Sequence, residues 1–521
     1  MPQSGAMPRK TTVRIVTLGC SKNDVDSEEI AGVLAEAGYR ADASVEKPDI
    51  TIINTCGFLQ DAKRESVREI RRAVRQKRDG ETGCVIVAGC LAQRYGRELA
   101  KLAPGADAYV GVGQMARFAE IVATTVDSRL ATADGKESSI ADRESPIVSV
   151  SPPHHRWANV STRARTGAPW SAYLKVSEGC NHKCTFCTIP SFRGPHVSKP
   201  VERILAEARH LSRTGAREIN LIAQDVTQYG HDLYGKFILP RLLRELNDVE
   251  GLDWIRLLYC YPSRLTGEVI ETMAALPKVL PYIDIPLQHA HREILRAMKR
   301  PGDGDKYLRL IETLRVAMPD VAIRTTFIVG FPGEAEAHFD YMLDFIRQAR
   351  LDRVGAFIYS REPGTPSHDM AGQVPAKVKA GRYERLMIEQ QGISLEKNRS
   401  WVGRTLEVLV EGPVSIDDSR LTIDDETEPG ACGRQSSIVN RISLAGRSFR
   451  DAPEIDGLVF VEGEAAPGDI VEAAVEDAAE YDLYARLTGR VHRRRVRTKP
   501  LRLAGEQRKG DTAMQHGRLS L

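Results

Sequence analysis

The sequence lacks the features that would place it in a membrane, in a secretory pathway or in a disulfide-rich class. It has no apolar run near the roughly 18 residues that a membrane helix needs, and MPQSGAMPRKTT at its start lacks the apolar core of a secretory signal. Nine cysteines in 521 residues are too dilute for a disulfide framework. With 42% hydrophobic and 27% charged residues, the composition also excludes wholesale disorder. We therefore expect a cytoplasmic protein of about three domains, whose reduced cysteines are metal ligands, catalytic groups or packing residues.

The net charge is small, +3, but it is strongly segregated along the chain. Residues 403–487 contain 7 Lys and Arg against 19 Asp and Glu, whereas residues 490–521 contain 10 against 2. The acidic segment is expected to repel nucleic acid and to attract basic partners, because summed charge sets the long-range field. The basic tail has three open interpretations: a nucleic-acid arm, a segment folded on the acidic module, or a solvated tail.

Residues 11–126 alternate short apolar runs with helical patterns. The runs VRIVTLGC, DITIINTC and CVIVAGC read as strands, with helices at about 26–37 and 59–78 between them. Alternating strands and helices, with strands buried on both faces, predict a doubly wound parallel sheet. The Arg and Lys residues of 64–78 are expected on the solvent face of their helix. Residues 127–170 lack periodicity and are expected to form a linker.

Residues 171–402 contain six strand-like runs with helical patterns between them: AYLKVS, EINLIA, WIRLLYC, PYIDIP, AIRTTFIV and RVGAFIY. This repeat predicts an incomplete parallel (β/α)6 barrel, whose chemistry should lie on the loops that follow the strands. A long helix, about 378–401, leads out of it. The short apolar segments of 403–489 predict a small antiparallel β-barrel. A polar insertion near 414–441 interrupts this module, and residues 490–521 form the basic tail.

The segment EGCNHKCTFC places Cys180, Cys184 and Cys187 directly after the first predicted barrel strand. Three thiolates in so short a loop can ligate three irons of a 4Fe-4S cluster with little loop-closure entropy. The fourth iron would remain open to bind S-adenosylmethionine and pass an electron to it. A zinc knuckle that recruits His182 is the alternative. The position at the mouth of a barrel favours the cluster, which leaves His182 beside the ligands.

A second set of cysteines is dispersed: Cys20, Cys56 and Cys90 each end a predicted buried strand. Ligands of doubly wound folds bind outside the carboxyl ends of the strands, so these thiols should converge in one crevice. Free cysteines are also common core residues, and spacing alone leaves a second cluster and simple packing as equal alternatives. The remaining cysteines are expected to be packing or incidental residues: Cys84, Cys260 and Cys432.

From about residue 13 to 487 the sequence resembles the radical S-adenosylmethionine methylthiotransferases. EGCNHKCTFC with the following IPSFRG is similar to the family's radical loop, and TLGCSKNDVDSE, NTCGFLQDAKRES and VAGCLAQRY are similar to its N-terminal motifs. The resemblance implies S-adenosylmethionine and two 4Fe-4S clusters, the second of them held by Cys20, Cys56 and Cys90. It also implies that the C-terminal module is a TRAM domain that helps to recognise substrate.

The family has two main branches, one acting on an adenosine of transfer RNA and one on an aspartate of ribosomal protein uS12. TLGCSKN, SEGCNHKCTFCTIP, LIAQDVTQYG and LPYIDIPLQHA resemble the ribosomal-protein branch. The acidic C-terminal module favours the same branch, because ribosomal proteins are basic and a transfer-RNA enzyme would want positive potential there. A non-catalytic iron-sulfur protein that binds ribosomes is a further alternative.

For this branch the resemblance implies methylthiolation of the aspartate β-carbon. A radical made from S-adenosylmethionine would abstract hydrogen from that carbon, so the cofactor supplies the reactivity and the protein supplies the aim. The second cluster would hold the sulfur that is methylated and transferred. An electron-donor protein and a source of sulfur are implied partners.

Five residues are expected to contact S-adenosylmethionine. Phe186, between two cluster ligands, is placed to cover the cluster and touch the adenine. Gln224 and Asp225 end the second barrel strand, where polar groups can meet ribose hydroxyls or the amino group. Gln288 and Arg324 lie at later strands or their ends. Ordinary packing is the alternative for each of the five, because the inner layers of such barrels are filled with side chains.

Overall fold

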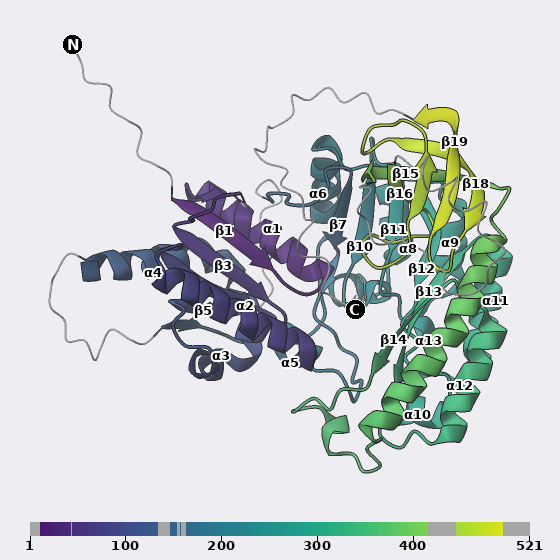
Figure 1. Ribbon diagram of the computed structural model, residues 1–521, viewed down its shortest axis with the longest axis horizontal. Helices are drawn as coiled ribbons and strands as arrows, with labels where there is room; N and C mark the ends of the chain where they lie inside the picture. Colours follow the sequence, from purple (N-terminus) through teal and green to yellow (C-terminus); the bar gives the residue numbers. More distant parts are fainter. Residues whose placement is uncertain are drawn as a thin grey trace, which may run out of the picture.

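The computed structural model describes residues 11–42, 44–133, 146–153, 157, 163–414 and 444–492, and Figure 1 shows three domains. Almost all of the predicted insertion near 414–441, and the basic tail beyond residue 492, lie outside the described residues. Within the described part of the chain, no helix combines the length and the apolar character that crossing a membrane would require.

The N-terminal domain is a parallel sheet with helices on both faces. The strand order is β2-β1-β3-β4-β5-β6. Helices α1 and α4 cover one face, and α2 and α3 cover the other, so the predicted doubly wound sheet is confirmed. The elements are β1 Thr12–Thr17, α1 Ser21–Glu36, β2 Arg40–Ala41, β3 Ile50–Thr55, α2 Gln60–Arg78, β4 Cys84–Gly89, α3 Cys90–Leu102, β5 Ala108–Val110, a 3-10 helix Val112–Arg117, α4 Phe118–Ala133 and β6 Ile147–Ser149.

Residues 127–170 differ in part from the linker that the sequence predicts. Helix α4 continues through Ala133, and β6 pairs in parallel with β5 at the edge of the sheet. An edge strand of three residues is too short to produce a recognisable alternation of apolar and polar positions. The N-terminal sheet therefore extends to Ser149.

The central domain contains the six predicted strands in a parallel sheet of order β14-β13-β12-β11-β10-β7. Because β7 and β14 are its two edges, the predicted barrel is incomplete, with an open side between them. The main elements are β7 Ser171–Lys175, α6 Val201–Arg213, β10 Glu218–Ile222, α8 Leu239–Asn247, β11 Trp254–Leu257, α9 Gly267–Ala275, β12 Val279–Asp284, α11 Gly304–Ala317, β13 Ala322–Val329, α12 Glu336–Ala349, β14 Arg353–Ile358 and α13 Ala376–Arg399. Shorter elements are β8 Ser177–Glu178, α5 Ile189–Arg193, β9 Val197–Ser198, α7 His231–Tyr234 and α10 Arg292–Ala297.

The C-terminal domain is a closed five-stranded barrel of order β15-β16-β17-β19-β18. It confirms the predicted small barrel, in which the strand pairs are antiparallel except for β17 with β19, which is parallel. The strands are β15 Thr405–Pro413, β16 Leu444–Ser448, β17 Val459–Glu462, β18 Ile470–Ala478 and β19 Leu483–His492.

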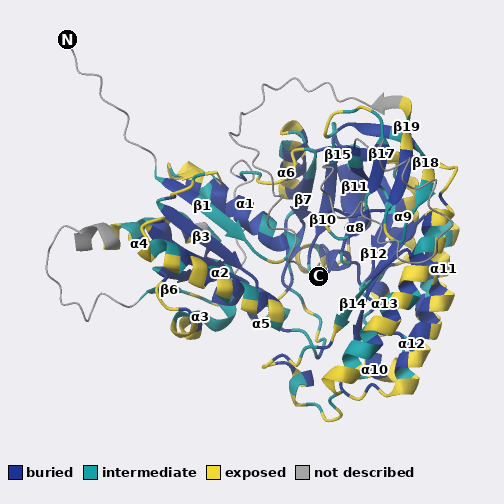
Figure 2. Cartoon of the chain, in the orientation of Figure 1, coloured by how far each residue is buried: buried dark blue, intermediate teal, exposed yellow. Residues whose placement is uncertain are grey.

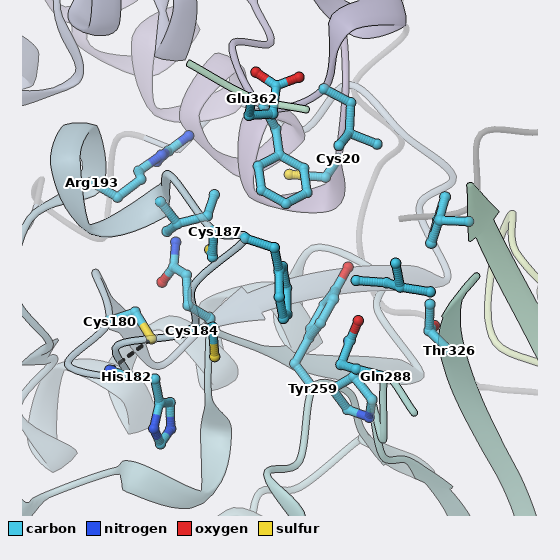
Figure 3. Close-up of a pocket in the computed structure, with 18 of the residues that line it drawn as sticks. Cys20, Cys180, His182, Cys184, Cys187, Arg193, Tyr259, Gln288, Thr326 and Glu362 are labelled. Atoms are coloured by element: carbon cyan, nitrogen blue, oxygen red, sulfur yellow. Dashed lines mark hydrogen bonds between the residues drawn. The ribbon is translucent and has the colours of Figure 1, made fainter. Parts of the chain in front are cut away.

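The N-terminal domain packs on the central domain through α1, which contacts β7. Figure 2 shows α1 as buried along much of its length, including positions whose side chains are polar. Lys175 of β7 pairs with Asp26 of α1 at 2.5 Å, and both side chains are buried. This packing brings the carboxyl ends of the strands of both domains to one shared cavity (Figure 3).

Candidate functional site

A single cavity of about 250 Å³ is lined by both sets of predicted ligand cysteines. Figure 3 shows Cys20 on the side of the N-terminal domain and Cys180, Cys184 and Cys187 on the side of the central domain. Cys56 and Cys90 also line it. Two triads that are at least 90 residues apart along the chain therefore share one space.

The N-terminal triad converges because β1, β3 and β4 are adjacent parallel strands. Cys20 lies three residues beyond β1, Cys56 directly follows β3, and Cys90 begins α3 directly after β4. A Cβ atom on Gly19 would lie 2.8 Å from the Cβ of Cys56, and one on Gly57 would lie 2.9 Å from the backbone of Cys90. Glycine beside two of the cysteines thus allows the three loops to approach closely.

The second triad lies in the loop that follows β7 and β8. Gly179 precedes Cys180 with φ +74°, and a Cβ there would lie 2.0 Å from the carbonyl oxygen of Pro195, so this position requires glycine. The amide of Cys187 donates to the carbonyl of Cys184 at 3.2 Å. The loop therefore turns back on itself and presents three thiols to one side, which is the donor set that iron-sulfur clusters use.

His182 lies beside this triad and has a different partner. Its Nε2 is 2.7 Å from Oδ2 of Asp225, and its ring stacks on Tyr261 with centroids 3.8 Å apart. Asp225 is 1% exposed and also accepts the hydroxyl of Thr227 at 2.5 Å. Asp225, predicted to contact S-adenosylmethionine, thus lies behind the cavity wall and orients His182.

Burial controls the protonation of the free thiols. It raises the pKa of Cys90 to about 11, although Arg193 acts in the opposite direction, and it raises the pKa of Cys180 to about 12. Burial also raises the pKa of Cys56 and Cys187, and neighbouring thiols of the same triad add to both shifts. Thiolates here need a compensating positive charge, which bound iron would provide, so cluster binding should release protons.

Each triad has one thiol that accepts a hydrogen bond from an arginine of the central domain. Arg193 donates from Nε and Nη2 to Sγ of Cys90 at 3.2 and 3.0 Å, and its guanidinium lies 2.8 Å from Asp26. Arg300 donates to Sγ of Cys184 at 3.7 Å. Hydrogen bonds and positive charge at cluster sulfurs shift reduction potentials, so these arginines are placed to tune any bound cluster.

Four of the five predicted cofactor contacts line the cavity: Phe186, Gln224, Gln288 and Arg324. Gln224 donates from Nε2 to Glu178 at 2.7 Å, while its buried Oε1 has no hydrogen-bond partner. A buried oxygen without a partner can accept a hydrogen bond from a ligand that carries an N–H or O–H group. Gln288 has φ +74°, an uncommon backbone conformation that often accompanies a binding function.

Arg324 reaches the cavity but is already paired. Its Nη1 donates to Asp284 at 3.0 Å, and its Nε lies 3.4 Å from Asp456 of the C-terminal domain. Both carboxylates are buried. Arg324 therefore links the cavity wall to the C-terminal barrel.

Many residues of the cavity wall were not singled out from the sequence, and five of them bear on the chemistry of the site. Two of them, Lys22 and Arg193, lie inside the quoted segments TLGCSKN and IPSFRG, where their motif was visible but their role was not. The other three have no local sequence signal, because only the tertiary fold brings them here: Tyr259, Arg300 and Glu362. Cys84 and Cys260 are buried in the two domain cores, as predicted, and Cys432 lies outside the described residues.

Comparisons with known proteins match the three domains in order. Residues 12–111 match Uncharacterized protein family UPF0004, residues 174–346 match the Radical SAM superfamily, and residues 402–488 match the TRAM domain. The central match implies S-adenosylmethionine and a 4Fe-4S cluster.

Curated relatives cover almost the whole chain. Ribosomal protein uS12 methylthiotransferase RimO of Chloroflexus aurantiacus is 45% identical over 487 residues, covering 90% of this chain and 98% of that protein. The protein of the same name from Moorella thermoacetica is 42% identical over 458 residues, with 87% and 94% covered. Among solved structures, the radical S-adenosylmethionine methyltransferase TsrM of Kitasatospora setae, with tryptophan and a cofactor analog bound, has a TM-score of 0.49 at 14% identity, covering 78% of this chain and 79% of TsrM.

Proposed function

The chain belongs to the ribosomal protein uS12 methylthiotransferases, a family of radical S-adenosylmethionine enzymes. From that premise we propose that it adds a methylthio group to the β-carbon of an aspartate in uS12. The observation that carries the proposal is the shared cavity: two cysteine triads, from two domains, open into one space. Transfer of a methylthio group needs a radical source and a sulfur source near the same substrate carbon.

We further propose that each triad holds a 4Fe-4S cluster, one through Cys180, Cys184 and Cys187 and the other through Cys20, Cys56 and Cys90. When bound, the first cluster supplies an electron for cleavage of S-adenosylmethionine and the second supplies a place for the sulfur that is transferred. The thiol donor sets and the glycine-lined approach of the N-terminal loops support this assignment.

The residues of the cavity wall then bind and orient S-adenosylmethionine, and they exclude water from it. Phe186, Gln224, Gln288 and Arg324 are assigned to the surface that S-adenosylmethionine contacts, and the unpartnered Oε1 of Gln224 supports this most directly. Asp225 contributes through His182. The walls contributed by both domains limit access of water, which protects a reactive intermediate from side reactions.

The acidic C-terminal domain supports a basic protein substrate. Residues 403–487 carry 19 acidic against 7 basic residues, and opposite charge steers association. The basic tail of 490–521, with 10 basic against 2 acidic residues, is proposed to contact ribosomal nucleic acid. The reaction also requires an electron-donor protein and a source of sulfur. We propose a cytoplasmic location, because the substrate is a ribosomal component.

The proposal is tested anaerobically with the reconstituted enzyme, a reductant, S-adenosylmethionine and sulfide. Purified uS12 and transfer RNA are offered separately, and each is examined by mass spectrometry. A methylthio group on an aspartate of uS12 is the expected result. The same group on transfer RNA alone would contradict the substrate assignment, and the absence of 5′-deoxyadenosine from every reaction would indicate the non-catalytic ribosome-binding alternative.

A further inference from the structure

Lys22 is a buried cation that faces the cavity. It is the second residue of α1, two residues after Cys20, and it is 7% exposed. Its side chain lines the cavity, and its Nζ lies 3.1 Å from the ring centroid of Tyr259, which comes from the loop after β11. The ammonium therefore stands between the N-terminal triad and the central domain.

Within the described residues, the ammonium of Lys22 has no hydrogen bond and no carboxylate partner. The arginines of the cavity wall differ: Arg193 pairs with Asp26, Arg324 pairs with Asp284, and Arg300 donates to the carbonyl of Pro286. The contact with Tyr259 stabilises the charge in part, but it leaves three N–H donors without oxygen acceptors. The ammonium is therefore able to donate to an anion inside the cavity.

The surroundings add positive potential at the same place. Lys22 lies in the first turn of α1, where the helix dipole is positive and backbone N–H groups have no acceptor within the helix. The carboxylates that line the cavity are already paired, Asp284 with Arg324 and Glu362 with Lys63. The position therefore suits an anion that enters the cavity from outside the chain.

Tyr259 holds the ammonium in this place. Its backbone has φ +62°, which non-glycine residues seldom adopt, and its amide donates to Oδ2 of Asp284 at 3.0 Å. The strained loop places the aromatic ring against Lys22, on α1 of the other domain. Figure 3 shows Tyr259 among the side chains of the cavity. Strain of this kind persists where the surrounding structure imposes it, and it is often found at binding sites.

We propose that Lys22 binds the side-chain carboxylate of the substrate aspartate. The inference rests on the proposed function, in which the reacting β-carbon is bonded directly to that carboxylate. A substrate carbon that enters the cavity must therefore bring an anion with it, and an unpaired anion would oppose entry. The ammonium of Lys22 neutralises the anion, fixes its direction relative to the thiols of the N-terminal triad, and makes the site selective for an acidic residue.

The test is a double-mutant cycle on binding. Holoenzyme with S-adenosylmethionine but without reductant is titrated with fluorescent uS12, or with uS12 in which the target aspartate is replaced by asparagine. The wild type should prefer the aspartate form by about tenfold or more, the usual value of a hydrogen bond to a charged group. Lys22→Met should lose this preference, and Lys22→Arg should keep most of it. Lys236→Met, which removes an exposed cation between α7 and α8, should keep the wild-type preference.

The outcomes separate the inference from the function on which it rests. If the wild type binds neither form of uS12, both are overturned. If the wild type discriminates and Lys22→Met discriminates equally well, the inference alone is overturned. An equal loss of affinity for both forms would also overturn it, because Lys22 would then serve another anion. Iron content is measured for each variant, and Lys22→Gln replaces Lys22→Met if the latter loses its clusters.

Discussion

At the scale of single residues, Arg193 joins the two halves of the cavity. It is 3% exposed and contacts Cys90, Asn23 and Asp26 of the N-terminal domain as well as Glu178 of its own domain. Because its partners are buried, its loss would leave Asp26 and Glu178 to share the one remaining charge of Lys175. The contact is therefore both structural and close to the proposed second cluster.

Arg193→Met should lower stability by about 3–5 kcal/mol, the usual cost of breaking a buried ion pair from one side. The measurement is the urea midpoint of the holoenzyme, followed by circular dichroism. Arg385→Met is the matched control, since Arg385 pairs with Glu336 and Asp340 at the surface and should change stability by less than about 1 kcal/mol. Equal midpoints for the two variants would show that Arg193 does not join the domains.

Residues whose role is local were predictable, whereas residues whose role is tertiary were not. The loop of Cys180, Cys184 and Cys187 brings its own ligands together, so spacing was informative. Lys22 lies among the polar residues of SKNDVDSEE, which resemble an exposed helix turn. It is buried because the central domain covers that face of α1, and no local pattern encodes this contact.

At the scale of elements, glycines at strand ends allow the loops of the N-terminal triad to meet. Gly89 ends β4 immediately before Cys90 with φ +94°, and a Cβ there would lie 2.3 Å from Oδ1 of Asn54 and 2.7 Å from the carbonyl of Thr55. These atoms belong to the neighbouring strand β3, so they have little freedom to move. The glycine is thus required for both conformation and space.

Gly89→Ala should destabilise the protein by about 2 kcal/mol or more, because strain and overpacking add. It should also lower iron content, since Cys90 directly follows. Gly381→Ala is the contrasting variant: a Cβ on this residue of α13 meets nothing within 4 Å, so it should stabilise the helix by up to about 1 kcal/mol. Thermal unfolding of both variants checks the pair. A Gly89→Ala protein as stable as wild type would refute the packing argument.

Elements with strong hydrophobic periodicity were predictable, and elements with weak signals were not. All six central strands appear where apolar runs predict them. Helix α1 begins at Ser21 rather than near residue 26, because its first turn is polar and Cys20 provides no side-chain cap. Strand β6 escaped prediction because its pairing with β5 depends on the sheet edge and not on its own three residues.

At the scale of the whole molecule, buried ion pairs hold the C-terminal barrel on the central domain. Glu218 of β10 lies between Arg256 of β11 and Arg447 of β16, at 3.1 and 2.7 Å, and these side chains are at most 1% exposed. Burial alone would raise the pKa of Glu218, but Arg447 and Arg256 outweigh it and lower the pKa to about 2. The ionised carboxylate therefore contributes to docking at neutral pH.

The depressed pKa predicts a specific acid sensitivity. Ionised Glu218 makes its full contribution to the free energy of unfolding above the ordinary pKa of 4.5. This contribution is lost as the pH falls from 4.5 toward about 2. Glu218→Gln should lower stability by about 3–5 kcal/mol at neutral pH, and its difference from wild type should shrink as the pH falls below 4.5. Glu476→Gln, at an exposed pair with Arg486, is the control. A pH-independent difference in urea midpoint would contradict the assignment.

The order of the domains was predictable from the sequence, but their arrangement was not. Each domain has its own periodicity, charge and motifs, which the chain displays in sequence. The placement of the N-terminal domain on the central domain depends on pairs such as Lys175 with Asp26 and Arg163 with Glu28, whose members are more than 100 residues apart. This placement creates the shared cavity on which the proposed chemistry depends.

The central claim is that two cysteine triads hold two clusters in one cavity, and iron content tests it most directly. The anaerobically reconstituted enzyme should contain about eight irons per chain. Replacing Cys20, Cys56 and Cys90 together by alanine should leave about four, and replacing Cys180, Cys184 and Cys187 should also leave about four. If removal of the N-terminal triad left the iron content unchanged, the two-cluster account would be contradicted.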